Sequence, residues 1–170
     1  LLMLVFISDL HLSDLTANPT ISADAFAKFA DVVKNLAANA EAEDIEIVYL
    51  GDIFEMMSTQ MWLDYNKLRP WSAKDSKEKK KTLESLVRDI LKAVCEQNKK
   101  AKEHMCALSQ EMAAQAVPDS YRYIPGNHDW IVNEFPRCRE EAAKFLLLDH
   151  DKKERFEGDH FWPDYRVFAR

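Results

Sequence analysis

The sequence predicts an α/β fold with a largely parallel sheet and flanking helices. Two apolar runs, Leu1–Ile7 and Ile45–Leu50, are typical of buried strands in a parallel sheet. Between them lies a predicted helix that starts at about Ser22. Its apolar side chains keep helical spacing: Phe26, Phe29, Val33 and Leu36. Strand, helix and strand in this order form a βαβ unit, which joins parallel strands by a right-handed crossover.

A long helical insert, residues 72–116, is predicted to follow the second strand. Ser72 and Asp75 have the spacing of a capping box at its start. Its apolar stripe comprises Leu83, Leu86, Val87, Ile90, Leu91 and Val94, and continues with Ala101, Met105, Leu108 and Met112. Because helices longer than about 25 residues are uncommon in globular domains, we expect a break near Asn98.

The remaining elements complete one predicted domain, residues 1–170. We expect a short third strand at "YRYI" (121–124), a helix over Phe135–Leu148 and a fourth strand at "DYRVFAR" (164–170). The length suits a single domain with a sizeable core.

Composition indicates a soluble globular protein, with 47% hydrophobic and 31% charged residues. The longest apolar run is far shorter than the roughly 20 residues of a membrane-spanning helix, and it has no basic leader or cleavage site. The three cysteines, Cys95, Cys106 and Cys138, form no CxxC pair. They favour free structural thiols in a reducing, cytoplasmic environment.

The net charge of −6 is unevenly distributed. Residues 74–103 carry a balance of +4 and the remainder carries −10. The acidic body disfavours non-specific DNA binding, which depends on neutralising phosphates. The lysines of "KDSKEKKK" can attract an anionic substrate to a cap over the site, or form the solvated face of an amphipathic helix. We favour the solvated face.

Aromatic and methionine side chains near the start of the insert also allow two interpretations. Met56, Met57, Trp62 and Trp71 can line a lipophilic pocket or pack in the core. We favour core packing, which is the usual place of such side chains.

Polar, metal-capable side chains follow each of the three predicted strands. They are Asp9 and His11 in "SDLHL", Asp52 in "GDIFE", and Asn127, His128 and Asp129 in "GNHD". In open α/β sheets, ligands bind beyond the carboxyl ends of the strands. Each cluster alone is compatible with an ordinary turn, but three at consecutive strand ends predict a metal site.

The spacing and residue types suggest how these side chains meet. Side chains i and i+2 of an extended segment point to the same side, so Asp9 and His11 can reach one ion. Asp52 can bridge two ions, and Asn127 offers a carbonyl oxygen. Mixed nitrogen and oxygen ligands suit manganese, iron or zinc. We expect Gly126 to allow the sharp turn that presents Asn127 and His128.

The motifs "DLHL", "GDIFE" and "GNHD" together resemble the first three motifs of the calcineurin-like metallophosphoesterases, over residues 1 to about 130. The resemblance implies half of that family's α/β/β/α sandwich, and two divalent metal ions (manganese, iron or zinc). It implies that Asp9 and His11 bind the first metal, that Asp52 bridges both, and that Asn127 binds the second. His128 would be the general acid or charge stabiliser at the phosphate. Asp129 would hold the loop or orient His128.

The sequence departs from the family downstream. The Gly-His and Gly-His-x-His motifs, which supply three more ligands in the family, do not occur here. The remaining histidines are His104, His150 and His160, and none follows a glycine. We therefore expect a C-terminally truncated domain with four of seven ligands, which binds metal weakly or singly and has little or no activity.

Three functions remain open at this point. The first is a metallophosphoesterase that hydrolyses a small or lipid-linked phosphoester. The second is a nuclease of the Mre11/SbcD type, which the acidic body disfavours. The third is an inactive, truncated binding domain, which the intact motif residues disfavour. The sequence does not identify the substrate or the oligomeric state.

Overall fold

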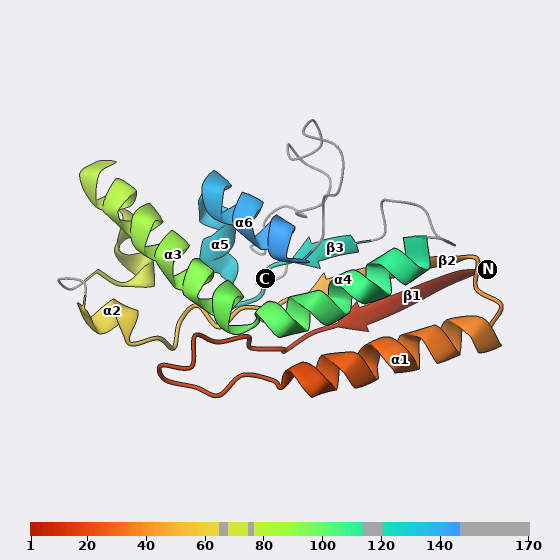
Figure 1. The fold of residues 1–170 in the computed structure, drawn as a ribbon. Helices are drawn as coiled ribbons and strands as arrows, with labels where there is room; N and C mark the ends of the chain where they lie inside the picture. Colours follow the sequence, from red (N-terminus) through yellow and green to blue (C-terminus); the bar gives the residue numbers. More distant parts are fainter. Residues whose placement is uncertain (65–67, 75–76, 114–120, 147–170) are drawn as a thin grey trace.

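The computed structural model describes residues 1–64, 68–74, 77–113 and 121–146 (Figure 1). It is an α/β fold with a three-stranded parallel sheet in the order β1-β2-β3 and with flanking helices. The predicted fold class is therefore confirmed at this level. The two-sheet sandwich of the metallophosphoesterases stays a prediction.

The strands coincide closely with the predicted ones. They are β1 (Leu2–Ile7), β2 (Asp44–Leu50) and β3 (Tyr121–Ile124). Their register runs from Leu2 opposite Asp44 to Ile7 opposite Tyr49, and from Ile47 opposite Tyr121 to Leu50 opposite Ile124. All three strands therefore end at the same edge of the sheet.

Helix α1 (Ala23–Asn39) crosses from β1 to β2 and begins directly after Ser22, as predicted. Its buried side chains are Phe26, Ala30, Val33 and Ala37. Helix α4 (Lys99–Ala113) packs against α1, and the two helices run along the sheet together (Figure 1). This layer of helices and the facing side of the sheet form part of one hydrophobic core.

The predicted helical insert forms the connection from β2 to β3. After α2 (Met61–Asp64) and a 3-10 helix, η1 (Pro70–Lys74), the chain forms α3 (Lys77–Gln97) and then α4. The expected break is confirmed at Asn98, between the two helices. The predicted stripe is fully buried from Leu83 to Val94, and the lysines at the start of α3 are exposed. The insert is thus mostly a packed crossover, with a solvated basic face.

The predicted capping box at Ser72 is wrong. Ser72 lies inside η1, where its Oγ accepts a hydrogen bond from the Arg69 amide at 3.0 Å. This local bond occupies the hydroxyl, and α3 begins only at Lys77.

The helix predicted over Phe135–Leu148 is confirmed over the described residues as one helix, and a short helix that we did not predict precedes it. These are α6 (Pro136–Leu146) and α5 (Trp130–Glu134), respectively. Phe135 is extended between them, with φ −125° and ψ 119°. The reason is local, because a proline disfavours the helical conformation in the residue that precedes it.

Strand β1 is half-exposed rather than buried. Leu2, Leu4 and Phe6 are 54%, 48% and 59% exposed, whereas Met3, Val5 and Ile7 pack on the core. Two right-handed crossovers that step in the same direction put α1 and α4 on one face of the sheet. Within the described residues, the other face of β1 has no comparable cover.

Some predictions fall beyond the described part of the chain. The fourth strand (164–170), His150 and His160 lie outside the described residues. Where the structure is described, no helix combines the length and the apolar character that a membrane crossing requires.

Candidate metal centre

The loops after β1 and β2 continue side by side beyond the sheet. The amide of His11 donates to the Asp52 carbonyl at 2.9 Å, and that of Leu12 donates to the Ile53 carbonyl at 2.8 Å. The Glu55 amide then returns a hydrogen bond to the Leu12 carbonyl at 2.9 Å. This ladder fixes the motif "DLHL" next to "GDIFE".

Three of the predicted metal ligands have a left-handed backbone. Asp9, His11 and Asp52 have φ values of 55°, 46° and 53°. This region is uncommon for residues other than glycine, and such strain is concentrated at functional sites. The segment from Asp9 to His11 is therefore not extended, and our i, i+2 argument for their proximity is wrong. The left-handed turns bring the two side chains together instead.

The first candidate ligand group comprises Asp9, His11 and Asp52. One ligand atom of each lies within 4.8 Å of the others. Asp52 Oδ1 also accepts a hydrogen bond from the His128 amide at 2.8 Å. The β2 loop is thereby joined to the "GNHD" turn, and Oδ2 and the remaining lone pair of Oδ1 can serve as ligands.

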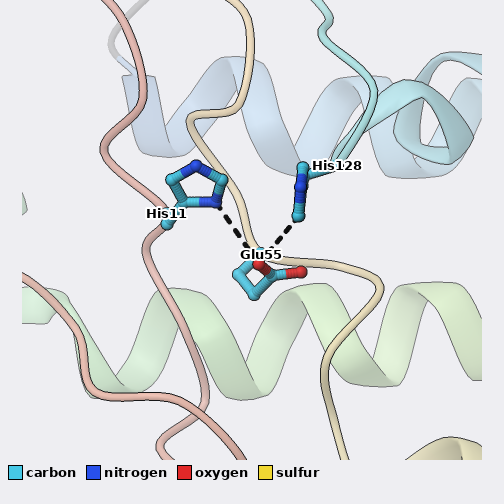
Figure 2. Close-up of side chains that lie close together, drawn as sticks. All are labelled: His11, Glu55 and His128. Atoms are coloured by element: carbon cyan, nitrogen blue, oxygen red, sulfur yellow. Dashed lines mark hydrogen bonds and ion pairs between the residues drawn. The ribbon is translucent and has the colours of Figure 1, made fainter.

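The second group comprises His11, Glu55 and His128, with ligand atoms again within 4.8 Å (Figure 2). Glu55 Oε2 lies 3.3 Å from His11 Nδ1 and 2.8 Å from His128 Nδ1. The two imidazole rings are 4.5 Å apart between centroids and nearly perpendicular. Figure 2 shows them approaching Glu55 from the β1 side and the β3 side.

Glu55 is held firmly in this position. Its side chain is 3% exposed, and Oε1 accepts hydrogen bonds from the amides of Met57 and Ser58 at 3.0 Å each. If both Nδ1 atoms carry protons, Glu55 orients both rings and leaves each Nε2 for a metal or a phosphate.

Opposing effects set the pKa values of the Glu55–His128 pair. Burial raises the pKa of Glu55, but the hydrogen bond from His128 and those from the Ser58 and Met57 amides lower it below its usual range. Partial burial lowers the pKa of His128, but the hydrogen bond and charge of Glu55, with Asp52 and Asp129, raise it above its usual range. The pair therefore favours a carboxylate and an imidazolium.

Glu55 has no role in our sequence prediction, although it is part of the quoted motif "GDIFE". The available signal was its setting. It follows Ile53 and Phe54, both 0% exposed, and precedes Met56, also 0% exposed. A carboxylate between such neighbours needs partners, since an unpaired buried charge is costly.

Asp129 holds the loops together, as we expected. Its Oδ2 accepts hydrogen bonds from the amides of Ile53 and Phe54 at 2.8 and 3.2 Å, and Oδ1 accepts one from Gly126 at 2.5 Å. Burial raises the pKa of Asp129, against the lowering effect of these donors and of Tyr123. Asp129 is fully buried and is in neither ligand group.

Gly126 is required by close packing rather than by a left-handed turn. A Cβ at this position would lie 2.5 Å from the Asp52 amide nitrogen and would overlap the Asp52 carboxylate. The left-handed residue of the pair is Gly51, with φ 73°, and its own Cβ would lie 2.9 Å from Gly126 Cα. The two glycines allow the ends of β2 and β3 to touch.

Asn127 and His104, which we also considered from the sequence, lie outside the two ligand groups. Asn127 is exposed in the turn before His128, at the correct edge of the sheet, and its role as a ligand stays a prediction. His104 is half-buried in α4 and belongs to neither group. Among the residues described, the two groups contain no cysteine.

The donor set fits a divalent transition metal. Carboxylate oxygens and imidazole nitrogens from three strand ends suit manganese, iron or zinc better than calcium or magnesium. The side chains of His11 and His128 are 36% and 32% exposed, so an ion can reach them from solvent.

Comparison with known proteins found no matching family model, no matching curated protein and no matching solved structure. The resemblance to the metallophosphoesterases therefore depends on the three motifs alone.

Proposed function

We propose that this chain carries the metal centre of a phosphoric ester hydrolase of the calcineurin-like type. The observation that supports this proposal most is the convergence of Asp9, His11, Asp52 and His128 at one edge of the sheet. They come from three strand ends that are far apart in sequence. Chance turn chemistry at three separate loops does not explain why the ligand atoms lie within 4.8 Å in two groups that share His11.

In this proposal, Asp9, His11 and Asp52 would hold a first divalent metal, and Asp52 and Asn127 would contribute to a second. When bound, the metal would supply Lewis-acid activation of the phosphoryl group and of an attacking water. The chain's contribution is to fix the ligands. The left-handed turns and the bond from the His128 amide to Asp52 do this before any ion arrives.

His128 is the proposed general acid. Water adds to phosphorus, the bond from phosphorus to the leaving oxygen breaks, and that oxygen takes a proton from the His128 imidazolium. The proton lost by the water goes to solvent. Glu55 is a positioning residue, because it orients the His128 ring and favours its protonated form.

Metal binding and turnover test the proposal together. We expect the purified chain to bind Mn²⁺ in a titration, and to hydrolyse at least one substrate slowly in a panel of aryl monoester, aryl diester, nucleotide and DNA. Excess chelator should abolish the hydrolysis. Absence of both Mn²⁺ binding and hydrolysis would overturn the proposal, and exclusive cleavage of DNA would favour the nuclease.

Variants separate the roles of the two histidines. His128→Ala should reduce kcat by about 10² to 10⁴ and leave the bound Mn²⁺ largely unchanged, as expected for loss of a general acid. His11→Ala should reduce the bound Mn²⁺ itself. His104→Ala, in α4, is the control and should change neither quantity. If His128→Ala removes the metal, its assignment as an acid is wrong.

A further inference from the structure

An apolar cavity of about 330 Å³ is lined in part by Met57 and Ser58, which follow Glu55 of the metal centre closely in sequence. Its walls are the loop 57–60, helix α2 and the 3-10 helix η1. Pockets for small molecules have volumes of about 300–1,000 Å³ and are mostly lined by apolar side chains. This cavity is at the small end of that range, so it suits one alkyl chain or aromatic group.

The wall of the cavity is hydrogen-bonded to the metal centre. Met57 and Ser58 line the cavity, and their amides donate to Glu55 Oε1. The other oxygen of the same carboxylate contacts His11 and His128. Two residues of chain span at most about 7 Å, so Glu55 and Met57 are necessarily close. Figure 1 shows α2 beyond the end of the sheet where the strands terminate.

The rim of the cavity exposes two large apolar side chains. Leu63 in α2 is 72% exposed and Trp71 in η1 is 71% exposed. Trp62, by contrast, is 4% exposed, and its Nε1 donates to the Met56 carbonyl at 2.8 Å. The core packing that we favoured for this group is correct for Met56 and Trp62 and in part for Met57, which packs against the core, but not for Trp71. Trp71 and the half-buried Met57 line the cavity.

The walls are held in place without a ligand. Arg69 Nη1 donates to the Trp62 carbonyl at 2.7 Å, which joins the segment directly before η1 to α2. The hydroxyl of Thr59, in the loop 57–60, donates to the buried carboxylate of Asp14. A preformed cavity loses little freedom when it binds a ligand.

We propose that this cavity binds the apolar alkyl or aryl group of a phosphoric ester whose phosphate lies at the metal centre. The proposal rests on the proposed function and names its substrate class. The hydrogen bonds from the Met57 and Ser58 amides to Glu55 link the cavity wall to the metal centre, and Leu63 and Trp71 offer apolar surface to the apolar group.

Two esters with leaving groups of similar acidity test the proposal. The wild-type chain with Mn²⁺ should hydrolyse para-butylphenyl phosphate with a kcat/KM about tenfold higher than that of phenyl phosphate, since each buried methylene contributes to binding. Leu63→Ala and Trp71→Ala should reduce this ratio toward one. Leu36→Ala, an equally simple change of a leucine that is 55% exposed in α1, is the matched control and should keep the ratio.

A binding measurement separates this proposal from the proposed function. Saturation-transfer NMR with para-butylphenol, which has no phosphate, should detect binding to the metal-free wild type and to Leu36→Ala, and much weaker binding to Trp71→Ala. Binding of this kind without any ester hydrolysis or Mn²⁺ binding would support the cavity and refute the hydrolase. Hydrolysis with equal kcat/KM for both esters, or butylphenol binding that both cavity variants retain, would overturn the cavity proposal alone.

Discussion

Glu55 determines how two histidines from different strands face each other. Its Oε2 contacts both Nδ1 atoms and its Oε1 is held by two backbone amides. Each oxygen of the buried carboxylate thereby has two polar partners, which stabilise its charged form. The consequence is that one side chain couples the orientation of the predicted ligand His11 to that of the predicted acid His128.

Replacing Glu55 by Gln should therefore lower the pKa of His128. In the metal-free wild type, Glu55 raises this pKa through a hydrogen bond and through its charge, and Gln removes the charge. Titration of the His128 Cε1 proton by NMR measures the change. An unchanged pKa of His128 in Glu55→Gln would contradict this role of the Glu55 charge.

The same pair gives a signed pH dependence of stability. The folded pKa of His128 is raised, so its contribution is present at low pH and is lost as the pH rises through that folded pKa. The folded pKa of Glu55 is lowered, so its contribution is present above the usual carboxyl range and is lost as the pH falls through the folded value. Urea unfolding of the metal-free chain should therefore show a stability advantage over Glu55→Gln that is largest between these two pKa values. An advantage that does not change with pH would contradict the ion pair.

At the scale of elements, the ends of β2 and β3 meet through Gly51 and Gly126. The carboxylate of Asp129 accepts hydrogen bonds from the loops after both strands, namely from the amides of Ile53, Phe54 and Gly126. The site is thus built on backbone contacts between elements as much as on its side chains. Sequence alone indicated a glycine requirement at Gly126, but not its cause, because the clash partner Asp52 is distant in sequence.

Gly126→Ala should destabilise the chain by about 1–3 kcal/mol, because the added methyl overlaps Asp52 in a packed site. Urea unfolding measures this loss, and the bound Mn²⁺ should fall with it as Asp52 is displaced. Asn127→Ala, at the exposed neighbouring position, should leave the unfolding free energy of the metal-free chain almost unchanged. If Asn127→Ala also leaves Mn²⁺ affinity unchanged, Asn127 is not a ligand.

The junction of α3 and α4 is fixed by one buried side chain. Asn98 is 3% exposed, its Nδ2 donates to the carbonyls of Ser13 and Val94 at 3.0 and 2.7 Å, and its Oδ1 accepts the Thr20 hydroxyl at 2.7 Å. The helix break thereby anchors the loop that follows the "DLHL" motif.

Asn98→Ala should cost about 1–3 kcal/mol of unfolding free energy, because it leaves buried polar groups without partners. Gln97→Ala, at the exposed preceding residue, is the matched control and should change stability by less than about 0.5 kcal/mol. Both are measured by urea unfolding at one pH. Equal effects of the two substitutions would show that the junction does not depend on the Asn98 side chain.

At the scale of the whole molecule, the pattern of apolar residues was sufficient to predict three strands, their parallel direction and the helices α1, α3 and α4. Periodicity reports which faces are buried, and the apolar runs and stripes here are long. It could not predict that β1 would be half-exposed. That depends on both crossovers lying on one face, a property of the topology rather than of the strand.

The site was predictable in its location and less so in its geometry. Parallel strands end at one edge, so the three polar clusters had to converge there. The left-handed turns at Asp9 and His11 and the central place of Glu55 depend on contacts between loops. No local pattern encodes such contacts. The apolar cavity was disfavoured against core packing, because the contact between Arg69 and the Trp62 carbonyl that helps to form its walls is not visible in the sequence pattern.

Metal binding should stabilise the whole chain if the ligands are arranged before the ion arrives. At a Mn²⁺ concentration of 100 times Kd, the expected gain is about 2.7 kcal/mol, and for a chain of this size each kcal/mol raises Tm by about 2–4 °C. Thermal unfolding followed by circular dichroism should thus show an increase of about 5–10 °C that chelator reverses. Asp52→Asn keeps an oxygen for the His128 amide and removes the charge, so it should lose most of this increase while the metal-free Tm changes little. His104→Ala should keep the full increase. An increase of the same size in Asp52→Asn would place the Mn²⁺ elsewhere on this acidic protein, and the predicted centre would then be wrong.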